Sequence, residues 1–373
     1  MRIARADQLI KTDCFYIKPH VRYVMSDYEV DVLMMSTPKT TWNWSVFNSY
    51  ERRYGGQDLN GKKVIIYRHN AYGDQLIASA VPHYLKTIYP DCNIHFYCHP
   101  QVRDLWEGNP FVQGGAISLP MEFDAVQNYD YHMFFEGMLE GNSERDQGNC
   151  YDDMFAWMGF DPEKVPTMYK RPHVFELPSD WTFFNTLPYR NKNFIVYHMN
   201  PDNLNRALHP ETSAGFLQAF VEAYPEYHVV VVGKDSMVQK IQMGQFVPKH
   251  DRIVNLMNKT QSFRDLIPFV REARCCVVPD SSILHLAAAF DTPTVSVWGI
   301  FHPNDRARYY KNDHPIYNEK VCPHFPCRDH TFELPVEQCK DAEGHQPKVV
   351  PMFCHALESI KTHQILDQLE NIL

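Results

Sequence analysis

The residues whose types and spacing most clearly suggest chemistry are Asp280, Ser281, Ser282 and His285. They follow an apolar segment with the pattern of a buried strand, and they open a helix of small residues. Such a turn presents hydroxyl and backbone N–H groups at the positive end of the helix dipole, where phosphate binds well. The pattern therefore predicts a phosphorylated ligand at the carboxyl edge of a parallel sheet. Taken one by one, a helix cap and a core histidine are simpler explanations.

A second candidate site lies in the loop after residues 64–68, which have the pattern of a buried strand. This loop holds one glycine, Gly73, so it matches neither the G-x-G-x-x-G dinucleotide fingerprint nor a Walker A loop. Gly73 would let the backbone approach a ligand, and Asp74 would place a carboxylate suited to general-base work at a cleft between domains. The alternative is that Asp74 caps a helix, which on spacing alone is the simpler explanation.

Two further loops carry charges that suit a nucleotide. Arg206 lies between a predicted strand and a predicted helix, where its planar guanidinium could bind a phosphate through two hydrogen bonds. Asp235 comes shortly after another predicted strand, a position that suits hydrogen bonding to ribose hydroxyls. A solvated surface charge at Arg206 and a helix cap at Asp235 are the alternatives.

Alternating strand and helix patterns position these loops. Strand patterns occupy residues 64–68, 94–98, 116–119, 131–135, 194–199, 228–233, 252–256, 275–279 and 294–298. Helical spacing occupies residues 74–89, 216–224, 236–245, 263–273 and 283–290. Strands joined through helices form right-handed parallel crossovers, so their carboxyl ends share one sheet edge. The sequence predicts an α/β protein with two Rossmann-like doubly wound domains facing a central cleft, on which the polar loops converge.

The length of the chain, 373 residues, exceeds what one hydrophobic core usually organises. A proline-rich, aperiodic stretch from about residue 161 to 191 is typical of a connection between domains. We expect an N-terminal arm or small antiparallel cap, two Rossmann-like domains, the second of which holds a cysteine cluster, and a C-terminal helix, over residues 1–60, 61–185, 186–355 and 356–373.

The composition is that of a globular protein, with 44% hydrophobic and 22% charged residues. The formal net charge of -9 argues against a surface built for sequence-independent binding to a nucleic-acid backbone. No run of 18 apolar residues occurs, and no apolar segment of a secretory signal follows the basic N-terminus. These features predict a cytoplasmic protein with no transmembrane segment.

Four of the ten cysteines gather near the C-terminus, at Cys322, Cys327, Cys339 and Cys354. Without a secretory signal, cysteines are expected to be thiols or metal ligands more often than disulfides. The count suits a tetrahedral thiolate site, but the spacing lacks two clean C-x2-C pairs. A structural iron or zinc ion is one interpretation, and four reduced thiols, some of them paired, are the other.

Together these residues resemble glycosyltransferase family 9, heptosyltransferase-like enzymes with the GT-B architecture. The resemblance runs from about residue 57 to the C-terminus. Gly73-Asp74 matches the family's Gly-Asp loop, and residues 206–210 are similar to its basic-x-Trp-Pro element. Residues 254–260 look like the segment before its base-contacting helix, and residues 280–289 resemble its Asp-Ser/Thr-Gly-x-x-His-Leu-x-Ala-Ala signature. Clustered C-terminal cysteines recur in the family, and in members that modify autotransporters they are thought to ligate iron.

The resemblance implies an inverting glycosyltransferase that moves a sugar from a nucleoside diphosphate sugar to an acceptor hydroxyl and needs no cofactor for catalysis. Asp74, in the acceptor domain, would deprotonate the acceptor. The residues expected to bind the donor in the C-terminal domain are Arg206, Asp235, Asp280, Ser281, Ser282 and His285. Ser282 stands where the family has glycine, and its hydroxyl could replace a backbone contact to phosphate.

Three alternative functions fit the same residues. The acceptor could be a hydroxymethylated DNA base instead of a glycan or a protein, although the acidic charge argues against this. A nucleotide-sugar epimerase of related architecture would convert the donor with no acceptor. A non-catalytic binding protein, clipped by a metal and with a decayed nucleotide site, would account for Ser282 and the cysteines. The nucleotide, the sugar, the acceptor and the oligomeric state are not determined by the sequence.

Overall fold

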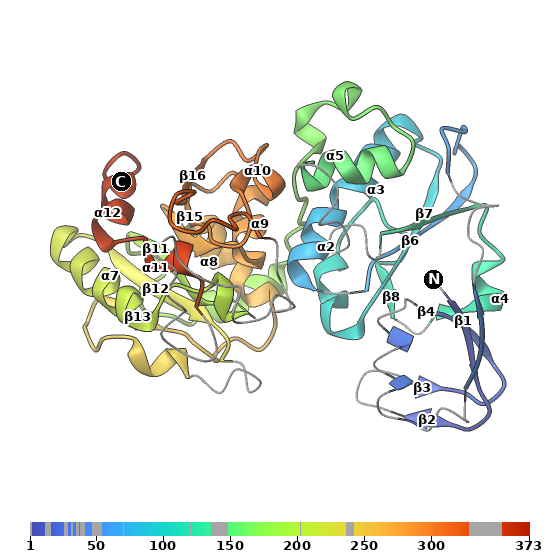
Figure 1. Cartoon of the computed structure of the whole chain (residues 1–373), viewed down its shortest axis with the longest axis horizontal. Coiled ribbons are helices and arrows are strands. Elements are labelled where there is room, and N and C mark those ends of the chain that lie inside the picture. The colour runs from blue at the N-terminus through green and yellow to red at the C-terminus, as the bar shows by residue number, and fades with distance from the viewer. Residues whose placement is uncertain are drawn as a thin grey trace. The chain divides into compact units, whose positions relative to one another are not determined.

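The computed structural model forms two compact units, and each is described by itself (Figure 1). Unit 1 contains Met1–Asn142 and Cys150–Phe175, and unit 2 contains Ser143–Asn149 and Glu176–Leu373. The structure describes residues 2–11, 16–25, 29–30, 33–34, 37, 42–46, 54–69, 71–118, 121–135, 148–201, 203–235, 242–327 and 353–373. The main part of unit 2 therefore begins at Glu176, where the sequence led us to expect a boundary between residues 185 and 186.

A buried ion pair explains why residues 176–185 belong to unit 2. The carboxylate of Asp180 accepts hydrogen bonds from Nε and Nη2 of Arg264, both at 2.7 Å, and both side chains are nearly inaccessible to solvent. Glu176 forms an ion pair with Arg271. A buried, fully bonded ion pair is costly to break, so these contacts hold the second half of the proline-rich stretch on unit 2.

Unit 1 is built on a parallel sheet in the order β10-β6-β7-β8. Its strands are β6 (Lys63–Tyr67), β7 (Asn93–Cys98), β8 (Ala116–Ser118) and β10 (Tyr131–Phe134). Strand β6 is central and buried, as its apolar run predicts. The strand order reverses between β6 and β10, so the carboxyl ends of these two strands border a topological switch point, where ligands bind in open α/β sheets.

The helix predicted over residues 74–89 is two helices, α2 (Tyr72–Ala78) and α3 (Ala80–Ile88). Pro82 explains the interruption, because it has no N–H to donate to the carbonyl of Ala78 and its ring crowds that carbonyl. Ser79, between the helices, donates its hydroxyl to the carbonyl of Leu76 and accepts from the backbone N–H of His173 at 2.8 Å. The break thus anchors a segment nearly 100 positions away in the chain.

The N-terminal residues form an antiparallel sheet in the order β5-β1-β4-β9, beside a small hairpin of β2 and β3. The strands are β1 (Arg2–Ala6), β2 (Ile10–Lys11), β3 (Tyr16–Ile17), β4 (Arg22–Met25), β5 (Trp42–Val46) and β9 (Met121–Glu122). Because β9 belongs to the segment between β8 and β10, this sheet is joined to the rest of unit 1. Tyr23 and Val24 share a buried apolar cluster with Ile65 and Tyr67 of β6. The short helix α4 (Phe123–Val126) and helix α5 (Cys150–Trp157) complete the unit.

Unit 2 is built on a six-stranded parallel sheet in the order β13-β12-β11-β14-β15-β16. Its strands are β11 (Phe194–Asn200), β12 (His228–Gly233), β13 (Ile253–Asn255), β14 (Cys276–Pro279), β15 (Thr294–Val297) and β16 (Asp313–Ile316). In chain order this is the 3-2-1-4-5-6 arrangement of a Rossmann sheet, whose switch point lies between the first and fourth strands. Here those strands are β11 and β14.

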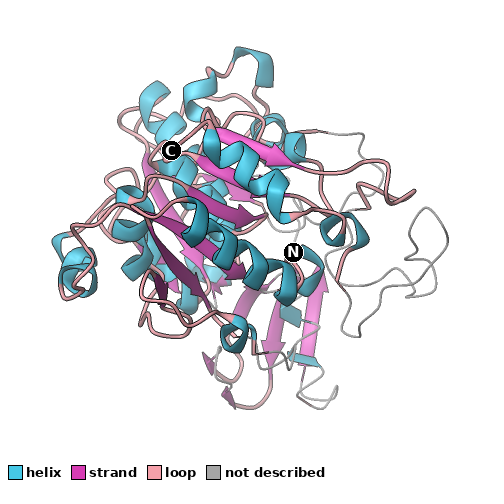
Figure 2. Ribbon diagram, turned by 90° about the vertical axis from the view of Figure 1, so that its left-hand side faces the viewer, coloured by secondary structure: helices cyan, strands magenta, loops and turns pink. Residues whose placement is uncertain are grey.

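Helices flank this sheet (Figure 2). They are α6 (Trp181–Asn185), α7 (Pro210–Ala223), α8 (Ile267–Glu272), α9 (Ser282–Ala289), α10 (Pro303–Arg306), α11 (His355–Glu358) and α12 (Thr362–Glu370). Helices α7 and α12 pack together. Of the helix predicted over residues 236–245, residues 236–241 lie outside the described part, and the turn Met243–Phe246 is a 3₁₀ helix. No helix in the described ranges is long and apolar enough to cross a membrane.

The edge strand β16 carries a half-buried carboxylate. Asp313 accepts hydrogen bonds from Thr294 Oγ1 at 2.7 Å and Ser296 Oγ at 2.9 Å. Burial raises the pKa of Asp313 to about 6, although both hydroxyl bonds act in the opposite direction. A carboxyl group whose pKa is higher in the folded than in the unfolded chain favours folding below about pH 4, and this contribution is lost as the pH rises through about 6.

We therefore expect Asp313→Asn to gain stability relative to the wild type as the pH rises. The difference in free energy of unfolding between variant and wild type should shift by up to about 3 kcal/mol in the variant's favour from pH 4 to pH 7.5. Urea unfolding of both proteins at several pH values measures it. A difference that is constant with pH would contradict the raised pKa of Asp313.

Candidate functional site

At the switch point of unit 2, a hydrogen bond links strand β11 to the chain just beyond β14. The Oγ atom of Ser281, just beyond β14, lies 2.8 Å from Nδ1 of His198 on β11. Burial lowers the pKa of His198 to about 4, and the positive charge of Arg206 acts in the same direction. His198 is therefore neutral at neutral pH. Ser281 precedes α9, but its side chain makes no capping hydrogen bond to that helix within the described residues. The first turn of α9 thus keeps the N–H groups that suit an anion.

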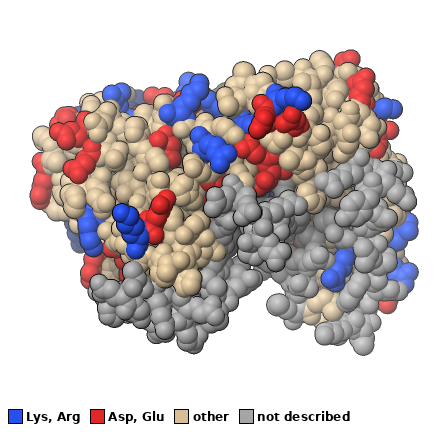
Figure 3. Space-filling view, turned by 45° about the horizontal axis from the view of Figure 1, so that its top comes forward, with Lys and Arg blue, Asp and Glu red and all other residues tan. Residues whose placement is uncertain are grey.

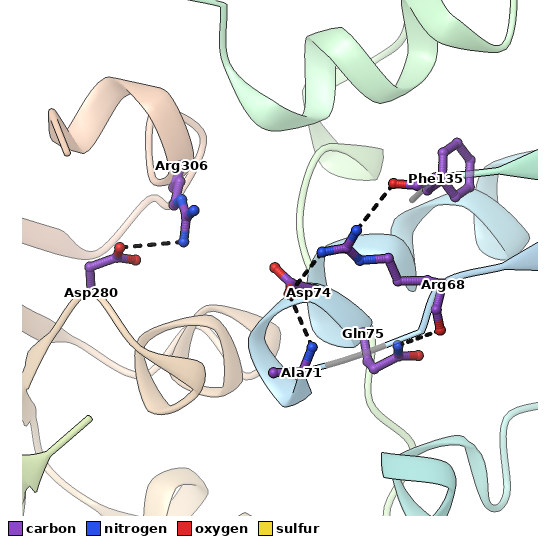
Figure 4. A network of polar contacts seen from close by, with 7 residues as sticks. All are labelled: Arg68, Ala71, Asp74, Gln75, Phe135, Asp280 and Arg306. Carbon is purple, nitrogen blue, oxygen red and sulfur yellow. Dashed lines mark hydrogen bonds and ion pairs between the residues drawn. The ribbon is translucent and has the colours of Figure 1, made fainter. Parts of the chain in front are cut away.

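Asp280, one residue earlier, lies between two arginines. Its Oδ2 atom is 3.3 Å from Nη1 of Arg306 and 3.9 Å from Nη1 of Arg206. Nη1 of Arg206 also donates to the backbone carbonyl of Asp280 at 3.2 Å. Figure 4 shows the contact between Asp280 and Arg306. Asp280 is 3% exposed, whereas the side chains of Arg306 and Arg206 are 10% and 16% exposed. Two cations therefore meet at the carboxyl edge of β14, where the sequence predicted phosphate binding.

Asp235 lies at the neighbouring edge position, after β12. Its carboxylate accepts from Asn258 Nδ2 at 2.9 Å and from the backbone N–H of Gly244 at 3.3 Å, and its own N–H donates to Asn258. Gly233, at the end of β12, has a φ of +143°, and a Cβ there would meet Met257 Sδ at 2.9 Å. A larger residue at Gly233 would therefore be strained and would require Met257 to shift, whereas glycine lets the chain turn tightly into the loop of Asp235.

Ser282 and His285 belong to α9 itself. Ser282 is the first residue of the helix, and its φ is not among the positive values of the described residues, so serine causes no backbone strain where the family has glycine. His285 is 1% exposed, and its Nδ1 atom lies 2.7 Å from the hydroxyl of Tyr310. The geometry of His285 is that of a core histidine with a polar partner, and its part in donor binding stays a prediction.

In unit 1, Gly73 and Asp74 lie in the first turn of α2. Oδ2 of Asp74 accepts from the backbone N–H of Ala71 at 3.0 Å and forms an ion pair with Nη2 of Arg68 at 2.9 Å (Figure 4). The Asp74 side chain is 21% exposed, whereas that of Arg68 is fully buried. Asp74, the third residue of α2, therefore helps to cap the helix through the backbone N–H of the N-cap residue Ala71.

Arg68 is held across the switch point of unit 1. Its Nη1 atom donates to the carbonyl of Phe135, beyond β10, at 3.2 Å, and its own carbonyl accepts from Gln75 Nε2 at 2.9 Å. Oε1 of Gln75 accepts in turn from the indole of Trp106 at 2.9 Å. These contacts orient the guanidinium toward Asp74. A charge at the end of an apolar strand was the signal in the sequence that could have identified Arg68.

The comparisons with known proteins bear on this geometry. Residues 223–333 match the model of glycosyltransferase family 9 (heptosyltransferase). This part of the chain is therefore similar to glycosyltransferase family 9. This segment includes Asp235, Asp280, Ser281, Ser282 and His285, and it confirms the resemblance predicted from the sequence. No curated protein matches the chain.

Solved structures of low sequence identity share the fold over most of the chain. The ADP-heptose lipopolysaccharide heptosyltransferase II of Escherichia coli is 14% identical, with a TM-score of 0.59 over 83% of this chain and 98% of that one. A family 9 glycosyltransferase of Veillonella parvula is 11% identical, with a TM-score of 0.59 over 85% and 98%. The iron-containing dodecameric glycosyltransferase TibC of enterotoxigenic E. coli is 13% identical, with a TM-score of 0.57 over 86% and 77%. The predicted GT-B fold, with two Rossmann-like units, is confirmed.

The structure brings some of the predicted residues together and not others. Arg206, Asp280 and Ser281 form one connected group at the switch point of unit 2, whereas Asp235 has its own partners in the next loop. Gly73 and Asp74 belong to unit 1. Sequence reasoning missed Arg306, which is inside the family 9 segment, and also His198 and Arg68. Arg306 is absent from the motifs because it follows β15 by several residues and reaches Asp280 only through the fold.

The cysteine cluster is only partly described, because Cys339 lies outside the described residues. Cys322, Cys327 and Cys354 lie in the described part of the chain, each half-buried. Burial raises the pKa of Cys354 to about 12, with smaller contributions from the nearby Cys327 and Cys322. Within the described part of the chain, no three His, Cys, Asp or Glu side chains are arranged to hold a metal ion. These residues alone therefore do not fit a metal site, and a structural iron or zinc ion stays a prediction.

Proposed function

We propose that this protein is an inverting glycosyltransferase that moves a sugar from a nucleoside diphosphate sugar to an acceptor hydroxyl, with no divalent ion in the transfer step. One observation carries the proposal. Arg306 and the first turn of α9, both inside the segment that matches family 9, meet Arg206 at the switch point of the sheet. Cations and helix N–H groups at such an edge suit a diphosphate, which is the leaving group of such a donor.

On the donor side, Arg206 and the N-terminus of α9 stabilise the charge of the departing nucleotide. As the bond between the sugar carbon and the phosphate oxygen breaks, the electron pair stays on that oxygen. Preorganised donors aimed at developing charge lower the barrier without moving during the reaction. His198, neutral and bonded to Ser281, keeps this edge in place. Asp235 is the candidate for the ribose hydroxyls, and Ser282 for a phosphate contact.

On the acceptor side, we assign Asp74 the role of general base. Its carboxylate takes the proton of the acceptor hydroxyl while the acceptor oxygen forms a bond to the sugar carbon from the face opposite the leaving group. This displacement inverts the configuration at that carbon. Arg68 orients the carboxylate through a contact to Oδ2. The neighbouring Gly73 lets the acceptor approach the first turn of α2.

A donor screen by thermal shift tests the proposed function. Because E. coli heptosyltransferase structures contain ADP or a fluorinated ADP-heptose, ADP is the first nucleotide to try, followed by UDP and GDP. A ligand present at 100 times its Kd stabilises the folded protein by about 2.7 kcal/mol, which gives a clear rise in Tm. We expect one diphosphate to raise the Tm more than its monophosphate. No shift with any nucleotide would favour a non-catalytic binding protein and contradict the proposal.

Two enzymatic alternatives lead to different products. An epimerase would convert the donor with no acceptor present, whereas a transferase leaves it intact apart from slow hydrolysis. A transferase acting on DNA bases would bind duplexes with a strong salt dependence. On the face drawn in Figure 3, the acidic and basic side chains of the described residues are interspersed and form no broad basic patch. This distribution and the net charge of -9 favour a glycan or protein acceptor.

A further inference from the structure

Arg306 contacts Asp280 in the structure, although the two residues are 26 positions apart in the sequence. It is the last residue of α10, and its guanidinium lies 4.0 Å from the centre of the Phe301 ring. At the start of the same helix, His302 Nδ1 accepts from the N–H of Asn304 at 3.1 Å, and the carbonyl of Asn304 accepts from Asn149 Nδ2 at 2.9 Å. Hydrogen bonds thus hold the start of α10. At the end of the helix, stacking on Phe301 orients the guanidinium of Arg306 toward Asp280.

Arg206 contacts the same carboxylate of Asp280 as Arg306 does. The Nη1 atoms of Arg206 and Arg306 both lie within 3.9 Å of the same oxygen of Asp280. The two guanidiniums are therefore close enough to act on one small ligand. Asp280 itself is repelled by a phosphate, so its carboxylate suits the holding of the arginines better than direct contact with the diphosphate.

We propose that Arg306 and Arg206 form a two-arginine clamp on the diphosphate of the donor, each binding one of the two phosphates, with Asp280 as the residue that positions both. This inference rests on the proposed function. A guanidinium presents a planar fork of donors that matches phosphate oxygens, and hydrogen bonds between charged groups are the strong ones. The clamp makes the number of phosphates, and not only their presence, a determinant of ligand choice.

A purely structural role for Arg306, as a counter-ion of Asp280, is the competing explanation. The two roles differ in what they do to ligands. Loss of a counter-ion of Asp280 would disturb the whole switch point and would weaken the binding of diphosphates and monophosphates alike. Loss of one arginine of a clamp would weaken the binding of a diphosphate. The binding of a monophosphate, which needs only one arginine, would be nearly unchanged.

The test compares nucleotide affinities of full-length Arg306→Gln and wild type by calorimetry. The probes are the tightest binder among ADP, UDP and GDP and its matching monophosphate. We expect Arg306→Gln to raise the Kd of the diphosphate about 10- to 100-fold, the loss of one hydrogen-bonded charge contact, and that of the monophosphate less than about threefold. Arg306→Lys, which keeps the charge but not the fork, should fall between Arg306→Gln and the wild type for the diphosphate.

Arg271→Gln is the matched control. Arg271 also pairs with a carboxylate, that of Glu176. It lies near the end of α8, which leads into the amino end of β14, whereas Arg306 contacts Asp280 at the carboxyl end of that strand. This variant should bind both nucleotides as the wild type does. An unchanged diphosphate Kd in Arg306→Gln, or an equal loss for both nucleotides, would overturn the clamp while leaving the proposed function intact. A wild type that binds no nucleotide would overturn the proposed function itself.

Discussion

Replacing Asp74 by asparagine is expected to lower kcat about 10²- to 10⁴-fold, the usual contribution of a general base, while donor affinity stays unchanged. Asparagine keeps an oxygen that can accept from the N–H of Ala71, so the start of α2 is preserved. It cannot take a proton from the acceptor. Transfer rates with a saturating donor, together with calorimetric donor binding, separate these two effects. Asp74→Glu, which keeps the carboxylate, should retain more activity than Asp74→Asn.

The buried Arg68 complicates this experiment, because asparagine also removes its anionic partner. Assays are therefore run well below the Tm of each variant. Asp130→Asn is the matched control in unit 1, because Asp130 accepts from the backbone N–H of Lys63 at 2.9 Å, at the start of β6. That end of the strand is opposite to the loop of Asp74. Transfer by Asp74→Asn at a rate within tenfold of the control would remove Asp74 from the role of base.

Replacing Asp180 by alanine is expected to lower the free energy of unfolding of unit 2 by about 3–5 kcal/mol. The variant leaves the guanidinium of Arg264 buried without the two hydrogen bonds that it makes to Asp180 at 2.7 Å. It also removes the acceptor of the N–H of Leu177. Urea unfolding measured by circular dichroism gives the change.

Two further variants test the cause of this loss. Glu176→Ala breaks the half-exposed pair with Arg271 in the same segment, and we expect a change within about 1 kcal/mol. The double variant Asp180→Leu with Arg264→Met removes both buried charges and should recover part of the stability lost in Asp180→Ala. A loss below about 1 kcal/mol in Asp180→Ala would show that the pair does not hold the segment on unit 2.

Much of the fold could be predicted because the strands of a parallel sheet are buried on both faces and so are continuously apolar. Strands β6, β11, β12 and β14 are of this kind. Strand β16, whose sequence is Asp313-His314-Pro315-Ile316, was not predicted, since an edge strand tolerates polar residues and proline. The split between α2 and α3 depends on Pro82, which a count of apolar positions passes over.

The candidate site could be predicted only in part. Asp280 and Ser281 were identified because a strand followed by a helix of small residues is a local pattern. The contacts that each side chain makes could not be predicted from that pattern. Ser281 was expected to cap α9 or bind phosphate. Its hydroxyl makes no capping hydrogen bond and contacts His198, 83 positions away in the chain, and its contact to phosphate stays a prediction.

By itself, the sequence determined the strand-and-helix alternation, the loops that carry polar residues and the resemblance to family 9, since each depends on neighbours within a few residues. Only the tertiary structure decided which of these residues meet. Arg206 is 74 positions from Asp280, and Arg306 is 26 positions from it. They converge because β11 and β14 become neighbours when the strand order reverses, and α10 folds back over the same edge. Strand order is set by packing over the whole sheet, and no local pattern contains it.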